Sequence, residues 1–330
     1  MKTYFNLLKK GALIGSLLLP LGVSAQDQVS DLMKGSPEDA GKLANAYLTP
    51  ALNGFGLGLN SGWYNSAKAK NTLRFDLRFT ATAAFVPQSD RTFDVNSLGL
   101  KTMSAVGSSI TPTISGPDQT GARMRLNSNG QEFNLPEGIG VSIVPSPQIQ
   151  LTVGLPKNID VSLRYIPKID LNDFGKVDLF GAGAKIEVLP LILGKVDKIV
   201  PVDVAIAVGY TQFNWDIPLE VGDNSKHDQH ISTKIKGLNI DAIVSKRFLF
   251  FTPFASVGFN NSNADIRALG TYQFGSDTVV DPFTIKQDYV NGLKASVGFQ
   301  LHLAFFRLYG SYTQSKYGYV NAGIGFGMGK

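Results

Sequence analysis

The sequence contains no cysteine, which excludes a disulfide framework and a lipid anchor on an N-terminal cysteine. Beyond residue 25 it has no apolar run that approaches the roughly 20 residues required by a membrane-spanning helix. It also has no basic stripe with interleaved aromatic residues, so a nucleic-acid partner is not expected. A chain with these absences can occupy a membrane only as a closed β-barrel.

The first 25 residues are typical of a secretory signal peptide. Lys2, Lys9 and Lys10 flank an apolar stretch at 11–21, and the small residues 23–25 precede the expected cleavage before Gln26. Removal of residues 1–25 removes three of the charges behind the formal net charge of +5, so the basic balance indicates little about partners. We therefore predict export from the cytoplasm.

Residues 72–86 alternate strictly between apolar and polar side chains, which is the period of a β-strand. Leu73, Phe75 and Leu77 begin one face, while Arg74, Asp76 and Arg78 begin the other. The run exceeds the 9–11 residues that cross a bilayer on a tilt, and the alternation returns in 293–303, 305–316 and 318–329. Long strands with a charged second face favour an outer-membrane barrel with a polar lumen. A secreted β-sandwich is the alternative.

We predict an all-β fold, an antiparallel transmembrane barrel of about 12 strands, with 14 as the alternative. Three long connections, 107–138, 215–231 and 261–289, then share one side, which we expect to be extracellular. Segment 264–274 is placed in a hairpin above the barrel. Pro145 and Pro147 weaken the strand at 139–155. The expected strands are 54–64, 72–86, 96–106, 139–155, 158–166, 176–188, 201–214, 232–247, 250–260, 290–303, 305–316 and 318–329.

A helix is expected between the signal peptide and the barrel. Ser36 suits the N-cap, Pro37 the first helical position, and Asp39 the acid of a capping box, while Pro50 should end the helix. Its apolar stripe consists of Ala40, Leu43, Ala44, Tyr47 and Leu48. Because so short a helix is marginal in water, we expect residues 26–52 to form a luminal plug and residues 53–330 to form the barrel.

Glycine alternates with apolar residues near both ends of the predicted barrel. Since the first and last strands of a closed barrel are neighbours, the glycines would face inward and form a wall without side chains. Glycine allows close backbone approach, so we expect the apolar stripe of the helix to dock on this seam; relief of crowding where the sheet closes is the alternative. The seam would consist of Gly54, Gly56, Gly58, Gly323, Gly325 and Gly327.

Charged residues at alternating positions should face the lumen. They form either a selectivity constriction or, as we favour, an ion-paired wall; they are Arg74, Asp76, Arg78, Lys294 and His302. No catalytic motif is present, so an enzyme is not expected. His227 and His230 lack a third nearby ligand, so neither a metal nor a cofactor is expected. Interface girdles are predicted for Trp63, Tyr64, Tyr210, Trp215, Tyr309, Tyr312, Tyr317 and Tyr319.

Three stretches carry a resemblance to a known family: YLTPALNGFGLGLNSGWYNSAKAK at 47–70, IVPVD at 199–203 before VAIAVGYTQ, and LAFFRLYGSYTQSKY with GIGFGMG at the end. The chain resembles a family of uncharacterised Gram-negative outer-membrane proteins, known as a domain of unknown function, over essentially its whole mature length. More distantly, its plug and glycine-rich segment are similar to the long-chain fatty-acid transporter family, whose barrels have a luminal hatch and pass hydrophobic molecules. The hatch region here is shorter than in that family.

The resemblance implies a passive channel for small hydrophobic molecules, with outer-membrane lipid around it and the barrel-assembly machinery as a partner. The chain departs from the usual terminal insertion signal, because Phe326 is followed by Gly-Met-Gly-Lys. The competing class is a non-transporting structural or surface-binding outer-membrane protein. A continuous apolar cavity beside the helix would favour transport, whereas a lumen filled by paired charges would favour a closed scaffold.

Overall fold

The computed structural model describes residues 32–194, 200–219, 228–274 and 277–327. The predicted signal peptide and residues 26–31 lie outside the described residues, as does His227. No helix within the described ranges is long and apolar enough to cross a membrane.

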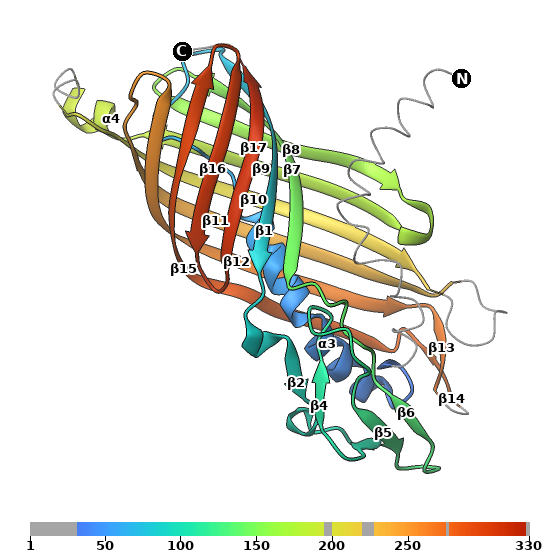
Figure 1. The fold of residues 1–330 in the computed structure, drawn as a ribbon. Helices are drawn as coiled ribbons and strands as arrows, with labels where there is room; N and C mark the ends of the chain where they lie inside the picture. Colours follow the sequence, from blue (N-terminus) through green and yellow to red (C-terminus); the bar gives the residue numbers. More distant parts are fainter. Residues whose placement is uncertain (1–31, 195–199, 220–227, 275–276, 328–330) are drawn as a thin grey trace.

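Ten strands form a closed antiparallel barrel (Figure 1). Each strand pairs with its neighbours in chain order, and β1 closes the cylinder by pairing with both β17 and β7. This confirms the all-β closed barrel. The strands are β1 (Phe75–Phe85), β7 (Ile143–Leu155), β8 (Ile159–Asp170), β9 (Lys176–Glu187), β10 (Asp203–Pro218), β11 (His230–Ser245), β12 (Phe251–Leu269), β15 (Phe283–Leu303), β16 (Phe306–Gln314) and β17 (Gly318–Gly327).

The predicted number of 12 strands is wrong by two. Residues 54–64 are not a strand, because their first half completes a helix, so residues 53–74 do not belong to the barrel wall. Residues 96–106 fall on a 3-10 helix, η3 (Val95–Leu98), and the short strand β3 (Met103–Ala105). The hairpin predicted at 264–274 is half right: 264–269 continue β12, and only β13 (Thr271–Phe274) enters a hairpin, with β14 (Asp277–Val280).

Pro145 and Pro147 are accommodated inside β7 because of where that strand is paired. Both lie opposite β1, but β7 pairs with β8 only from Gln150 to Leu155. The prolines therefore occupy a stretch with one free edge, where a missing amide N–H breaks no ladder.

The two ends of the barrel differ. The connections 86–142, 219–229 and 270–282 leave one end, here called the loop end, which confirms that the three long connections share a side. The opposite end, the turn end, carries the short links at 156–158, 246–250 and 304–305 and the helix α4 (Leu189–Leu193). Residues 86–142, the loop-end subdomain, contain η2 (Gln88–Asp90), η3, and the small sheets β2 (Thr92–Asp94) with β4 (Ile110–Pro112) and β3 with β5 (Arg123–Leu126) and β6 (Glu132–Asn134).

The outer face of the barrel carries an apolar band. At these positions large apolar side chains are at least one third exposed, while their sequence neighbours point inward and are mostly small or polar. On β11, for example, the buried Asn239 and Asp241 alternate with the exposed Leu238 and Ile240. A soluble protein buries such residues, so this band must meet an apolar solvent or partner. Its members include Phe79, Leu151, Leu163, Ile206, Val208, Leu238, Ile240, Val257, Phe259, Leu293, Val297, Val320 and Ile324.

Strands β10, β11, β12 and β15 continue beyond the band toward the loop end. There the inner face is apolar and the outer face is polar, the reverse of the band. Lys234 and Lys236 point outward on β11, whereas Ile235 between them is buried. The inward side chains of this wall form a core with Leu59 and with the partly buried Leu52 and Phe55 of the helix. We call this part the wall extension; its inner face is covered by the helix rather than by water.

The helix α3 (Pro37–Leu59) runs from the loop-end subdomain into the barrel (Figure 1). The Ser36 hydroxyl accepts a bond from the Asp39 amide, which confirms the N-cap. The helix does not end at Pro50, which lies inside it, but continues to Leu59. Packing decides this, because Pro50 and the glycines after it are buried against their surroundings.

The apolar stripe of the helix does not dock on the glycine seam. Leu43, Ala44 and Tyr47 pack in one core with side chains of the loop-end subdomain such as Met103 and Met124, with Leu48 at its edge. Ala40 packs in a separate core against Tyr272 and Leu219. The first half of α3 is thus held by the connections at the loop end. It does not lie inside the lumen, where the sequence analysis placed it.

Candidate functional site: the occupied lumen

Three glycines let the second half of α3 fit between opposite walls of the barrel. A Cβ on Gly54 would lie 2.6 Å from the Cβ of Val144, and one on Gly58 would collide with Ser146, both on β7. A Cβ on Gly56 would lie 2.8 Å from the Cβ of Ser262 on β12. Residues four apart share a helix face, and the residue between them points the other way. The alternation predicted as a strand is therefore a helix thinned on two opposite sides.

Gly323, Gly325 and Gly327 face inward on β17, as predicted, because they pair with the inward residues Thr80, Arg78 and Asp76. The atoms nearest to an added Cβ at these positions are not on the helix. An added Cβ there would meet the backbone of β1 or the side chains of Thr80, Tyr309 and Arg307. The docking of the helix on this seam is wrong, since neighbouring strands already fill the space; the six glycines belong to two separate contacts.

After α3 the chain crosses the rest of the lumen without regular structure, and polar side chains of the wall bond its backbone. Arg164 on β8 donates to the carbonyls of Leu59 and Ser61 at 2.8 and 2.6 Å. Lys185 donates to the carbonyls of Ser66 and Lys68 at 2.9 and 2.8 Å. An extended segment cannot satisfy its own backbone, so the wall supplies the partners. We call residues 52–74 the luminal segment.

Further bonds attach this segment to strands around the barrel. The Trp63 carbonyl accepts from Arg78 of β1 at 3.0 Å and from Gln150 of β7 at 3.2 Å. The Ala67 amide donates to Ser245 of β11 at 2.9 Å, and the Lys70 amide to Asp160 of β8 at 2.8 Å. The segment is thus fixed to several strands at once.

The Trp63 indole lies deep in the lumen against β8, β9 and β10. The Arg164 guanidinium stacks over its ring at 3.7 Å from the centroid, and Gly183 and Gly209 leave the space that the ring occupies. Arg164 is 1 % exposed and was missed by the sequence analysis, although its place in an alternating strand could have indicated an inward charge.

The predicted lumen charges all face the interior or its mouth. Asp76 and Arg78 are buried on β1, and Lys294 is buried in an ion pair with Asp241 at 3.0 Å. Arg74 precedes β1 and is exposed at the turn end, so its assignment to the strand is wrong. His302 lines the same mouth. Asp76 is paired across strands with Arg307, and Lys294 with Asp241, as the ion-paired interpretation expects.

The aromatic girdles are largely wrong. Tyr210 and Tyr312 are outward and exposed, but Trp63, Tyr64, Tyr309, Tyr317 and Tyr319 are buried. Trp215 is partly buried and packs on the inner core of the wall extension. These side chains fill the interior because the luminal segment and the inward strand positions bring them there.

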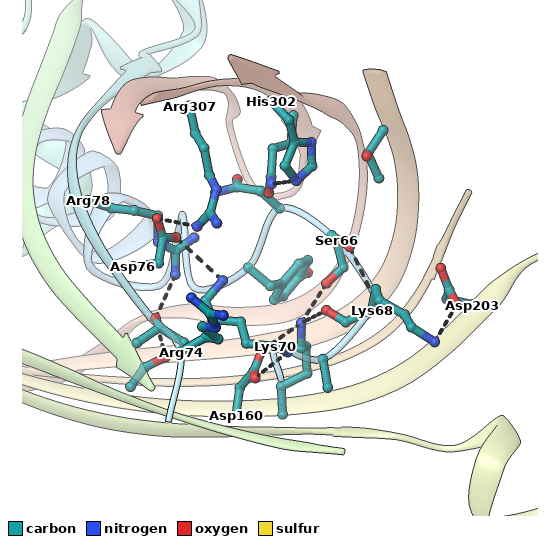
Figure 2. A pocket seen from close by; sticks show the side chains of 18 of the residues that line it. Ser66, Lys68, Lys70, Arg74, Asp76, Arg78, Asp160, Asp203, His302 and Arg307 are labelled. Carbon is teal, nitrogen blue, oxygen red and sulfur yellow. Dashed lines mark hydrogen bonds and ion pairs between the residues drawn. The ribbon is translucent and has the colours of Figure 1, made fainter. Parts of the chain in front are cut away.

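A cavity of about 350 Å³ opens at the turn end beside the luminal segment (Figure 2). Arg307 bonds the Asp76 carboxylate at 2.8 Å, and Lys70 approaches it at 3.6 Å. Lys185 pairs with Asp160 at 3.0 Å, and Lys68 pairs with Asp203 at 3.2 Å. We call this the turn-end cavity.

Burial lowers the pKa of the Lys70 ammonium to about 8, although the Asp76 and Asp160 carboxylates favour its charged form. Within the ranges that the structure describes, no group of three or more histidines and carboxylates could hold a metal ion. The cavity is therefore a polar, ion-paired space without a preformed metal site among these residues.

The family model that matches this chain covers residues 1–328 and describes a family of unknown function, DUF6588. The chain belongs to this family. Among curated proteins, no sequence match is found. The distant similarity to the long-chain fatty-acid transporter family stays a prediction.

Solved structures with partial similarity are barrels of the bacterial surface. The attachment invasion locus protein Ail of Yersinia pestis is 8% identical, with a TM-score of 0.27, over 78% of this chain and 100% of Ail. The translocator domain of the autotransporter NalP from Neisseria meningitidis is 10% identical, with a TM-score of 0.31, over 84% and 93%. A mutant of the monoaromatic hydrocarbon channel TodX is 7% identical, with a TM-score of 0.23, over 79% and 91%. The barrel assignment rests on the strand pairing of this chain.

Proposed function

We propose that this protein is an outer-membrane barrel closed by its own N-terminal segment, which presents the loop-end subdomain at the cell surface and does not conduct. This is the non-transporting alternative of the sequence analysis. The proposal rests above all on one observation: the luminal segment bonds through its backbone to inward polar side chains of several strands.

Two features support the location. The apolar band on the outside and polar side chains within are the arrangement of a barrel in lipid. The long connections share one end and the short links at 156–158, 246–250 and 304–305 share the other, so the loop end faces outward and the turn end faces the periplasm.

The contents of the lumen favour closure over transport of hydrophobic molecules. The turn-end cavity is lined by ion pairs such as Lys185 with Asp160, rather than by a continuous apolar surface. Farther in, Lys294 pairs with Asp241, and both are buried. An apolar solute would find no continuous apolar surface to contact here. It would also separate buried charges from their ion-pair partners, which costs free energy.

The loop-end subdomain is held rigidly to the plug. The Asp39 carboxylate is buried and accepts bonds from the backbone amides of Lys101 and Thr102 at 3.0 and 2.8 Å, and from the Thr102 hydroxyl. Together with the core around Leu43 and Tyr47, these bonds fix the subdomain as a surface platform.

Conductance in planar bilayers tests the proposal. The wild-type protein is expected to be electrically silent. Gly56→Leu should produce openings, because any Cβ at position 56 collides with Ser262 and forces α3 from the wall. Gly292→Leu is the matched control, since a Cβ there meets no heavy atom within 4 Å. Heat-modifiable gel mobility reports whether each variant folds.

Steady conductance of the wild-type protein, or saturable passage of a monoaromatic hydrocarbon through it in liposomes, would contradict closure and support the passive channel. Silence of wild type and of Gly292→Leu with openings in Gly56→Leu is the expected set of results.

A further inference from the structure

The turn-end cavity has an excess of positive charge. Among the residues that the structure describes, seven cationic side chains line it against three carboxylates, a difference of four. Glu187, which bonds Lys68 at 2.7 Å beside the cavity, reduces this excess to three. The cations are Lys68, Lys70, Arg74, Arg78, Lys185, Arg247 and Arg307; the carboxylates are Asp76, Asp160 and Asp203.

The excess is concentrated around one carboxylate. Asp76 faces Arg307 at 2.8 Å and both Arg78 and Lys70 at 3.6 Å, and all of these side chains are at most 20% exposed. Asp160, which accepts a bond from the Lys70 amide, pairs with Lys185, so this larger group of four cations and two carboxylates has an excess of two positive charges. Like charges repel strongly where water is largely excluded, so an anion of charge −2 in the adjoining cavity would balance the cluster.

Two further arginines stand at the rim of the cavity. Arg74 precedes β1, and Arg247 lies in the link between β11 and β12; both are exposed. Neither forms an ion pair with a carboxylate in the part of the chain that the structure describes. The Arg247 Nε–H donates a hydrogen bond to the carbonyl of Leu249 at 3.0 Å, and this bond orients the guanidinium. The rim therefore presents two guanidinium groups to a solute that enters from the turn end.

We propose that the turn-end cavity binds a small solute through a phosphoryl group, with Arg74, Arg78, Arg247 and Arg307 as its cationic lining. A phosphate monoester carries close to two negative charges at neutral pH, and the guanidinium fork matches its oxygens. The cavity, about 350 Å³, admits a small phosphorylated solute. This site is separate from the loop-end platform and goes beyond the closed-scaffold function, because it requires only that the mouth be accessible.

Calorimetric titration tests the site, with inorganic phosphate as the probe and purified full-length protein in a neutral, phospholipid-free detergent at low salt. Saturable binding at one site per barrel is expected, weaker as salt is added. The double variant Arg74→Gln with Arg247→Gln should bind about tenfold or more weakly, since each arginine supplies charge-assisted bonds. These exposed residues can be changed without disturbing the buried cluster.

Arg267→Gln is the matched control, because Arg267 is an exposed arginine on the wall extension, paired with Asp265 at 2.7 Å and far from the turn end in sequence and topology. It should leave phosphate binding unchanged. A second titration uses vesicles of phosphatidylglycerol, which carry phosphoryl groups on a lipid surface.

Absence of saturable phosphate binding, equal weakening by Arg267→Gln, or equal affinity for succinate would each overturn the proposal. Vesicle binding that the double variant weakens, without binding of free phosphate, would overturn the small-solute assignment in favour of a lipid headgroup. Binding of free phosphate that only the double variant weakens would support the proposal, and closure of the lumen remains testable by conductance whatever this result.

Discussion

The band and the wall extension lie on the same strands yet have opposite faces. On β11, Leu238 and Ile240 point outward in the band, with Asn239 and Asp241 inside. A few residues earlier on that strand, Lys234 and Lys236 point outward and Ile235 points inward. Inward and outward positions keep alternating without a register shift along β11. Only the polarity of the side chains at these positions changes. Alternation of apolar and polar side chains thus identifies β11 as a strand over its whole length, while the surroundings of each face decide which side is apolar.

The exchange of faces marks where the apolar surroundings end. In the band the lumen is polar because it holds the backbone of the luminal segment. In the extension the inner face is apolar because α3 covers it with Leu52, Phe55 and Leu59. Substitutions in the band and in the extension can therefore be tested separately. The two tryptophans, Trp63 in the lumen and Trp215 on the extension, provide fluorescence reporters for unfolding in urea.

Ile235→Asp should have the largest effect. Ile235 is 3% exposed within the core of the wall extension, so a carboxylate there would be buried without a partner. The cost should be about 3–5 kcal/mol of unfolding free energy. Urea unfolding in lipid vesicles, followed by tryptophan fluorescence, measures it. A loss below about 1 kcal/mol would mean that α3 does not cover this wall.

Ile240→Arg should rank second. Ile240 is 44% exposed on the band, and arginine on the lipid face of a barrel costs about 2–4 kcal/mol near the midplane. The same urea unfolding experiment applies, and unfolding in detergent micelles with a thin hydrophobic core provides the comparison. An unchanged midpoint in vesicles would place this face in water and contradict the membrane boundary.

Asp39→Asn should weaken the loop-end subdomain with little change in the barrel. The variant loses the charge of a carboxylate that accepts three bonds from Lys101 and Thr102, worth about 1.5–3 kcal/mol for that contact. Limited proteolysis should cut within 86–142 about tenfold faster while the barrel stays folded. Equal cleavage rates in variant and wild type would show that Asp39 is not the anchor.

Lys236→Gln should have the smallest effect, within about 0.5 kcal/mol, because the exposed side chain meets water on the extension. It is the surface control for Ile235→Asp on the same strand. A loss as large as that of Ile240→Arg would mean that the outer face of the extension is buried in the assembled protein.

The barrel could be predicted from the sequence because period two is a local property of each strand. The start of α3 was equally local, since Ser36 and Pro37 define an N-cap wherever the helix packs. Its end could not be predicted: Pro50 and the alternating glycines oppose a helix by propensity, and only the two walls at Val144 and Ser262 make that thin helix stable.

The site was predicted in part for a related reason. Inward charges such as Asp76 and Arg78 follow from strand alternation, so their direction could be predicted from one strand. Their partners could not, because Arg307 reaches Asp76 only through closure of the barrel, 231 positions away in the chain. Arg164 and Lys185 also donate to backbone carbonyls of the luminal segment, and no sequence pattern indicates such bonds.

Disulfide formation within the lumen tests the central claim, that the N-terminal segment occupies the barrel. The chain has no cysteine, so Ser61→Cys with Thr82→Cys introduces a single pair, at positions whose side-chain hydroxyls are hydrogen-bonded to each other, one on the luminal segment and the other on β1. After mild oxidation of intact outer membranes, we expect a cross-linked species of altered mobility on a non-reducing gel. We expect none for Ser61→Cys with Gly292→Cys, because a Cβ at position 292 meets no heavy atom within 4 Å. Failure of the first pair to cross-link in folded protein would contradict the occupied lumen.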